Sequence, residues 1–488
     1  MLVFAVVARF TARSHLWLDE ALSVNIARLP LGELPEALRH DGAPPLYSFL
    51  LHGWMKVFGT SEMAVRALSG LFAVATLPLM WVAGRRLGGR RMAWAAVLLL
   101  AASPFAVRYA TEARMYSLIA LLVLVGYLAL TDLLRRFSWP AAVGVAVSTG
   151  LLMLTHYWSF FLLAVVVAMV GWRARRSAGR SEARRALVAM AAGTVLFLPW
   201  APSFVYQMRN TGTPWAGRPD LGTLFDTVTR FSGGPWEPGF ALTLISYGLI
   251  ALAVLGRSVD RRRIELDLRT RPGGRHLAVV VFGTLLLATA VGMITGSAYA
   301  VRYAAVVAPL FVLLVALGTR VFEDPRVFRG VLAVAVVLGV IAVIPNMVGE
   351  RTTAAKVAAA IAARAQPGDV VAYCPDQLGP SVSRHLPEQG LVHVTFPTSD
   401  LGPERIEWVG YEARNRAART APFADLLLSR AGPANDIWLV WSPGYRTFST
   451  KCSALADRLE QARPDMTRVV KVKSKVFEHP GLIQYRPA

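Results

Sequence analysis

Ten apolar runs of 16 to 22 residues divide the chain up to residue 345, and they constrain the fold more than any other feature. A helix of that length crosses the hydrocarbon core of a membrane. The chain is 55% hydrophobic and 17% charged, whereas a soluble protein carries roughly a quarter charged residues. The ten runs lie at 64–83, 92–107, 115–134, 139–155, 157–172, 186–203, 240–256, 277–298, 303–319 and 330–345.

An eleventh run, at 1–10, is too short to span and lacks the basic start and cleavage site of a signal peptide. A late start codon or a lost N-terminal half-helix would explain it. We therefore predict a polytopic α-helical membrane protein with about 11 transmembrane helices.

The positions of the arginines predict how this bundle is oriented. The formal net charge is +21, but the arginines gather in short segments between spans, which favours a cytoplasmic side over a nucleic-acid partner. The first loop (11–63), the short turns and the tail then fall on the extracytoplasmic side of a bacterial plasma membrane. The Arg-rich segments are 85–91, 135–136, 173–185, 257–275 and 320–329.

The tail from residue 350 differs from the rest in composition. A helix is predicted at 354–365, followed by strands at 369–374, 391–396, 436–441 and 466–473, which indicates a small α/β domain. We divide the chain into a transmembrane domain, 1–349, and an extracytoplasmic domain, 350–488. Cys374 and Cys452 both lie in this tail; a disulfide and two free thiols remain equally open.

The first loop carries the most informative polar residues. Asp19 and Glu20 stand among Trp17, Leu18, Ala21 and Leu22, an unusual place for charges without a role. They are a solvated pair, or an N-cap for a helix that begins near Ala21, or carboxylates with raised, coupled pKa values suited to a general base. Residues 21–38 favour amphipathic helices lying in the membrane interface, and 45–58 favour a helix that Gly59 ends.

Further polar residues recur at the same predicted side. Arg114, in the turn after Glu112, is either half of a loop ion pair or a phosphate clamp. Arg66, Arg108 and Arg302 each stand at a span end, where an arginine by itself is more often a membrane anchor. His156 alone is more typical of an interfacial histidine than of a catalyst. No metal-binding motif of familiar spacing is present, so no metal ligand is assigned.

These motifs follow one another in a recognisable order. The set resembles glycosyltransferase family 39 of the GT-C fold, the group of protein O-mannosyltransferases and of aminoarabinose and Rgt-type sugar transferases. The resemblance covers roughly residues 10–320. It rests on Trp17-Leu18-Asp19-Glu20-Ala21, His40-Asp41, Pro44-Pro45-Leu46-Tyr47, Val65-Arg66-Ala67-Leu68, Glu112-Ala113-Arg114-Met115-Tyr116, His156-Tyr157 and Arg302-Tyr303.

The resemblance implies a polyprenyl-phosphate-linked sugar as donor and inversion at the anomeric carbon. It makes Asp19 the base for the acceptor hydroxyl, with Glu20 positioning the acceptor or the loop. The residues expected at the donor phosphate are Arg114, Arg66, Arg302 and His40. Those expected to contact substrate are Asp41, Tyr47, Glu112, Tyr116 and His156.

The predicted activity is therefore transfer of a sugar, mannose favoured, to a glycan, glycolipid or protein hydroxyl of the cell envelope. A transporter or flippase of polyprenyl-linked intermediates is the alternative, although such proteins place ionisable residues in mid-span. A membrane scaffold whose tail binds glycan is a third hypothesis. The sugar, the acceptor and any dependence on a divalent cation remain open.

Overall fold

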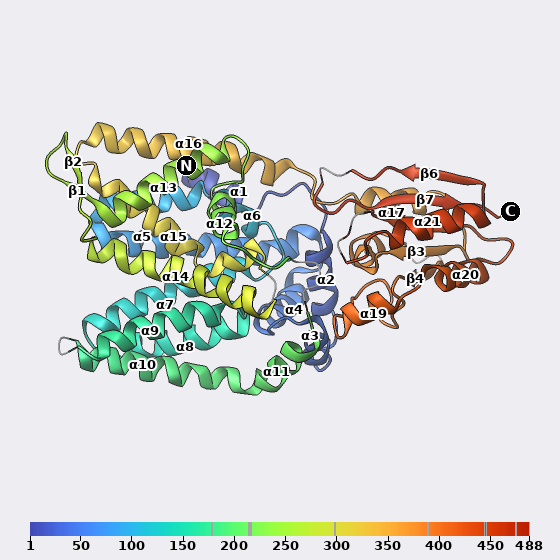
Figure 1. Ribbon diagram of the computed structural model, residues 1–488, viewed down its shortest axis with the longest axis horizontal. Coiled ribbons are helices and arrows are strands. Elements are labelled where there is room, and N and C mark those ends of the chain that lie inside the picture. Colours follow the sequence, from blue (N-terminus) through green and yellow to red (C-terminus); the bar gives the residue numbers. More distant parts are fainter. Residues whose placement is uncertain are drawn as a thin grey trace.

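The computed structural model combines a long helical bundle with a sheet-containing tail at one end (Figure 1). It describes residues 1–176, 179–212, 217–296, 299–387, 390–443, 445, 447–473 and 476–487. Helices α2, α3 and α4 lie where the two parts meet, whereas the β1–β2 hairpin lies at the opposite end of the bundle (Figure 1).

Within the described residues, each predicted apolar run is mainly helical, starting with α1 (Leu2–Ala8), and the end of the run at 277–298 lies outside the described residues. The first two long runs share α5 (Glu62–Ala101), whose backbone leaves the helical conformation at Gly88 and Gly89. Gly89 has a φ of +75°, which a residue without a Cβ adopts at little cost. The remaining bundle elements are α6 (Pro104–Ala110), α7 (Tyr116–Arg135), α8 (Trp139–Thr155), α9 (Ser159–Ala174), α10 (Arg180–Thr194), η1 (Val195–Trp200), α11 (Ala201–Asn210), α12 (Gly222–Phe231), α13 (Gly239–Leu255), β1 (Gly256–Ser258), β2 (Ile264–Leu266), α14 (Pro272–Thr295), η2 (Val301–Val306), α15 (Ala308–Gly318), η3 (Thr319–Val321) and α16 (Pro325–Val348).

Among the described residues, five helical stretches are long and apolar enough to cross a membrane. Four shorter apolar helices accompany them, at Trp139–Thr155, Ser159–Ala174, Gly239–Leu255 and Ala308–Val321. The 40 residues of α5 are about twice as many as one crossing needs, and the break at Gly88–Gly89 divides the helix into two stretches of unequal length. The length and composition of these helices support a membrane bundle, and the number of spans stays a prediction.

The first loop forms α2 (Leu18–Ala27), α3 (Leu34–Asp41) and α4 (Leu46–Phe58). Gly59 ends α4 with a φ of +79°, as predicted. The expectation that residues 21–38 lie in the membrane interface is wrong. Leu22, Ile26 and Leu38 are buried in a core shared with Phe396 and other tail residues, so the apolar side of α2 and α3 covers protein instead of lipid.

The tail contains the four predicted strands and one more. The sheet order is β4 (Val392–Thr395), β3 (Val370–Cys374), β5 (Ile437–Trp441), β7 (Gly481–Tyr485) and β6 (Met466–Val470). β3 is parallel to β4 and β5, whereas β7 runs antiparallel between β5 and β6. The sequence missed β7. The tail helices are α17 (Ala354–Ala362), η4 (Asp376–Leu378), α18 (Gly379–Ser383), α19 (Tyr411–Ala417), α20 (Thr420–Ala431) and α21 (Lys451–Ala462).

Successive side chains of each strand point to opposite faces of the sheet, and helices cover both faces, so the tail has three layers. Along β3, Ala372 packs in one core with residues of α20 and α21, and Tyr373 packs in the other with residues of α17. Cys374, at the end of β3, forms a disulfide with Cys452 of α21. This bond decides between the two alternatives that the sequence left open.

Candidate active site

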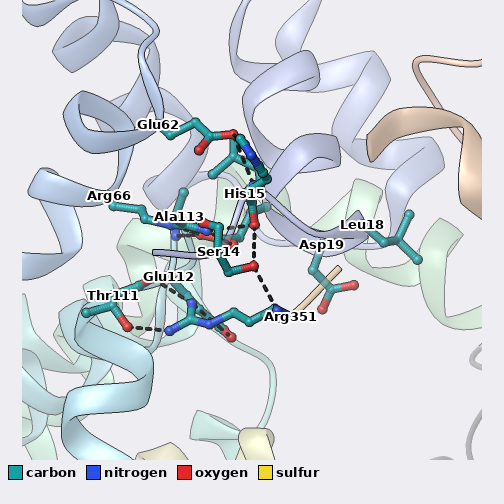
Figure 2. A network of polar contacts seen from close by, with 12 residues as sticks. Ser14, His15, Leu18, Asp19, Glu62, Arg66, Thr111, Glu112, Ala113 and Arg351 are labelled. Carbon is teal, nitrogen blue, oxygen red and sulfur yellow. Dashed lines mark hydrogen bonds and ion pairs between the residues drawn. The ribbon is translucent and has the colours of Figure 1, made fainter. Parts of the chain in front are cut away.

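The first turn of α2 presents Asp19 and Glu20 in different directions. A helix N-terminus favours carboxylates, because its free N–H groups carry partial positive charge. Glu20 points into the protein and is 0% exposed, whereas Asp19 is 16% exposed. Figure 2 shows Asp19 standing apart from the network of contacts around Arg66 and Arg351.

Both carboxylate oxygens of Glu20 accept hydrogen bonds. The Nε and one terminal nitrogen of Arg66 each donate to it at 2.7 Å, and the backbone N–H of Ala113 donates at 3.0 Å. Burial raises the pKa of Glu20, but the Arg66 ion pair outweighs burial and the pKa lies below its usual value. Of the two roles predicted for Glu20, the geometry favours positioning the loop.

The guanidinium of Arg66 makes further hydrogen bonds within the protein. Its other terminal nitrogen donates to the carbonyl of Ser14 at 2.6 Å, and the terminal nitrogen that bonds Glu20 also donates to the carbonyl of His15 at 3.1 Å. Because the guanidinium binds protein on every nitrogen, the geometry does not favour the phosphate-binding role predicted for it. Arg66 fixes the chain just before α2 instead.

Asp19 lies between two arginines, Arg302 and Arg114. Its Oδ2 is 3.5 Å from Arg302 and 4.0 Å from Arg114, and it accepts no hydrogen bond from any described residue. Arg114 also donates to the Ser23 hydroxyl at 2.9 Å. Burial lowers the pKa of Arg114 and Arg302, but the Asp19 carboxylate raises it further, so both stay charged. The site therefore places one carboxylate, whose Oδ2 accepts no hydrogen bond from the described residues, beside two cations.

His156 and two tyrosines line the same place. The ring of His156 lies 5.0 Å from that of Tyr303 and 6.1 Å from that of Tyr116. The backbone N–H of Trp158 donates to Nδ1 of His156 at 3.1 Å. Burial, together with Arg114 and Arg302, lowers the pKa of His156 to about 3, so its imidazole is neutral. It contributes a dipole and no charge.

Asp41 and Tyr47 come from the next segments of the first loop. Burial and the Asp19 carboxylate raise the pKa of Asp41 to about 6, against the effect of Arg114. The Tyr47 hydroxyl lies 2.9 Å from the Ser69 hydroxyl, which donates to the carbonyl of Arg114 at 3.0 Å. Asp41 therefore borders the Asp19 site, and Tyr47 supports the Arg114 turn from behind.

The remaining predicted residues take other partners. His40 lies 2.6 Å from Glu407 and 3.1 Å from Glu36, which ties α3 to the tail and does not favour a role at a donor phosphate. Glu112 is 1% exposed, 2.8 Å from Arg108 and 3.9 Å from Arg351, so it neutralises buried arginines and offers no surface to a substrate.

The sequence missed two buried charged residues near the site. Arg351 donates to the carbonyl and hydroxyl of Thr111 at 2.8 and 2.6 Å, and its backbone N–H donates to Ser14 at 2.8 Å (Figure 2). Glu478 accepts from Ser381 at 2.7 Å and from the backbone N–H of Leu18 at 3.3 Å. Through these contacts, both residues connect the tail to the first loop. No motif surrounds either residue, so no local signal identified them.

One protein-family model matches part of the chain. Residues 42–202, about a third of the chain, match the model of the dolichyl-phosphate-mannose-protein mannosyltransferase family. No curated protein matches the sequence.

Solved structures match nearly the whole chain. ArnT from Cupriavidus metallidurans in the apo state is similar over 99% of this chain and 96% of its own, with a TM-score of 0.60 and 16% identity. ArnT bound to undecaprenyl phosphate gives the same coverage, a TM-score of 0.58 and 14% identity. The arabinofuranosyltransferase AftD from Mycobacteria matches over 100% of this chain and 39% of its own, with a TM-score of 0.57 and 15% identity.

The family match and the shared fold, together with the order of the sequence motifs, identify the chain as a membrane glycosyltransferase of the GT-C fold, similar to glycosyltransferase family 39.

Proposed function

We propose that this glycosyltransferase moves a sugar, mannose in the first place, from a polyprenyl-phosphate-linked donor to a hydroxyl of a cell-envelope glycan, glycolipid or protein. The observation that carries the proposal is Asp19 lying between Arg302 and Arg114, at 3.5 and 4.0 Å. The mannosyltransferase family match supports mannose, and the ArnT structure with undecaprenyl phosphate supports a polyprenyl carrier.

Asp19 acts as the base in this proposal. A hydroxyl is a weak nucleophile and needs a base within hydrogen-bond reach. The Oδ2 of Asp19 accepts no hydrogen bond from the described residues, so it is available to accept one from the incoming hydroxyl. As the bond from the acceptor oxygen to the anomeric carbon forms, the hydroxyl proton passes to Asp19.

Arg114 and Arg302 serve the leaving group. The bond between the anomeric carbon and the phosphate oxygen breaks on the opposite side of the sugar, which inverts the anomeric configuration. The polyprenyl phosphate takes the electron pair and gains negative charge, which two fixed cations stabilise. The neutral His156 beside them adds no competing charge, because its pKa is about 3.

We place this reaction on the extracytoplasmic face of a bacterial plasma membrane, with 1–349 as the transmembrane domain and 350–488 as an extracytoplasmic domain. The Arg-rich β1–β2 hairpin, the C-terminal end of α9 and the N-terminal end of α10 lie at the end of the bundle away from the tail (Figure 1), which supports this orientation. The disulfide between Cys374 and Cys452 also supports it, since such bonds persist outside the cytoplasm.

The experiment uses the purified protein in lipid vesicles with synthetic polyprenyl-phosphate sugars. Mannose and arabinose donors are compared, with membrane glycans, glycolipids and Ser/Thr peptides as acceptors. We expect transfer from one donor, with an inverted anomeric configuration by NMR. Movement of the donor between leaflets without any transfer would contradict the proposal and support the flippase alternative.

A further inference from the structure

Three ligand-type side chains from distant parts of the sequence meet beside the first loop. His15 precedes α2, Glu62 opens α5, and His385 follows α18 in the tail. One nitrogen of each histidine and one oxygen of Glu62 all lie within 4.8 Å of one another. We propose that these three residues bind a zinc ion that joins the tail to the catalytic loop.

The distances fit a shared metal ion. Four ligands at the usual Zn–N and Zn–O distances of about 2.0 to 2.1 Å lie about 3.3 Å from each other in a tetrahedron. Nδ1 of His15 is 3.1 Å from Oε1 of Glu62, and Nε2 of His385 is 3.7 Å from the same oxygen. Small rotations of these side chains would bring all three atoms onto one ion.

The polar atoms of the cluster are incompletely satisfied by protein. The Nε2 of His385 is buried and makes no hydrogen bond to any described residue. The two imidazole rings meet edge to face with their centroids 5.0 Å apart, and one nitrogen of each ring lies near the same Glu62 oxygen. A buried ring nitrogen without a partner costs free energy, and a metal ion would remove that cost.

The chemistry of the three ligands indicates which metal would bind. Two imidazoles and one carboxylate suit zinc, whereas calcium and magnesium prefer oxygen ligands alone. Half of the His15 side chain is exposed, which leaves room for a water molecule as the fourth ligand.

Neighbouring contacts hold the ligands in place before any ion arrives. Arg384 donates to the carbonyl of Thr60 at 2.6 Å, which fixes His385 beside the start of α5. The backbone N–H of Leu16 donates to Glu62 at 3.2 Å, which fixes His15 from the other side. Asp19 is four residues from His15, so a bound ion would stiffen the segment that carries the proposed base.

The test measures zinc content, and its result does not depend on whether sugar transfer is found. Protein purified without a histidine tag is stripped with a chelator, exchanged into zinc, desalted and analysed by mass spectrometry. We expect one zinc per chain, and a cobalt-substituted sample with the visible absorption of a tetrahedral site. His15→Ala and His385→Ala should each weaken zinc binding by at least about tenfold.

Two further variants separate loss of a zinc ligand from misfolding and from the loss of an unrelated histidine. Glu62→Gln retains an oxygen for the Leu16 N–H, so the fold survives while the anionic ligand is lost, and it should also weaken zinc binding. His276→Ala removes an imidazole from α14 and should bind zinc as the parent does. Equal zinc content in the parent and the three cluster variants, or none in the parent, would overturn the proposal.

Discussion

Glu20 and Arg66 form a two-pronged ion pair, with both nitrogen–oxygen distances at 2.7 Å and with Glu20 fully enclosed. The pair joins the first turn of α2 to α5, 46 residues further along the chain. Asp19 directly precedes Glu20, so the direction of its side chain depends on this pair. The adjacent carboxylates thus have separate tasks, one structural and one proposed as chemical.

Breaking one half of this pair should destabilise the protein strongly. Glu20→Gln leaves the Arg66 charge buried without its counter-ion, which costs about 3–5 kcal/mol. Glu20→Gln with Arg66→Met removes both charges and should lose less than the sum of the two single changes. Thermal unfolding of the four proteins in one detergent measures this; additive losses would show that the two residues are not coupled.

Arg302 should control binding of the phosphate. We expect Arg302→Gln to weaken binding of a polyprenyl phosphate by about tenfold to a hundredfold, because a charge-assisted hydrogen bond contributes about 1.5–3 kcal/mol. The turnover rate should fall as well, since the leaving phosphate loses a cation. Arg230→Gln, which alters an exposed pair with Asp226, is the matched control. Equal binding by both variants would place the phosphate elsewhere.

Glu478 should make stability depend on pH. Burial raises the pKa of Glu478 from 4.5 to about 7. Between pH 4.5 and pH 7, Glu478 is therefore protonated in the folded chain and ionised in the unfolded chain. Stability therefore falls as the pH rises from about 4.5 to 7 and then levels off, by a total of about 3 kcal/mol. Glu478→Gln should flatten this part of the profile.

Melting temperatures between pH 4 and 8 measure the effect. Glu412→Gln, at an exposed helical pair with Arg416, should leave the profile unchanged. Asp376, whose pKa burial raises to about 7, adds a slope of the same sign that remains in both variants. A Glu478→Gln profile as steep as that of the parent would show that Glu478 stays ionised in the folded protein.

Impermeant thiol labelling should report the orientation. Both natural cysteines are in the disulfide, so they give no background. Arg13→Cys lies at an exposed position before α2 and should react in intact cells. Arg262→Cys, exposed between β1 and β2, should react only after permeabilisation. Reaction of both from the same side would remove the proposed meeting place of donor and acceptor.

The bundle was predictable because a membrane demands apolar runs of nearly uniform length. The residues around Asp19 were also predictable in part, since Arg114 and Arg302 belong to motifs that recur in a fixed order. Their mutual distances were not, because residues 19 and 302 approach only through packing of the whole bundle.

Other parts of the site left no local signal. Arg351 follows a span, where a lone arginine usually anchors a helix at the interface, yet here it is buried against Thr111. The interface prediction for residues 21–38 failed for a related reason. An amphipathic helix has the same pattern whether lipid or protein covers its apolar side, and Phe396 and its neighbours come from a distant segment.

The transfer rate of Asp19→Asn in reconstituted vesicles tests the central claim most directly. Asparagine keeps the size of the side chain but cannot take the acceptor proton, so the rate should fall by about 100-fold or more while the melting temperature changes little. Glu20→Gln, studied alongside, should lower the melting temperature instead. A near-normal rate for the Asp19→Asn protein would contradict the assignment of Asp19 as the base.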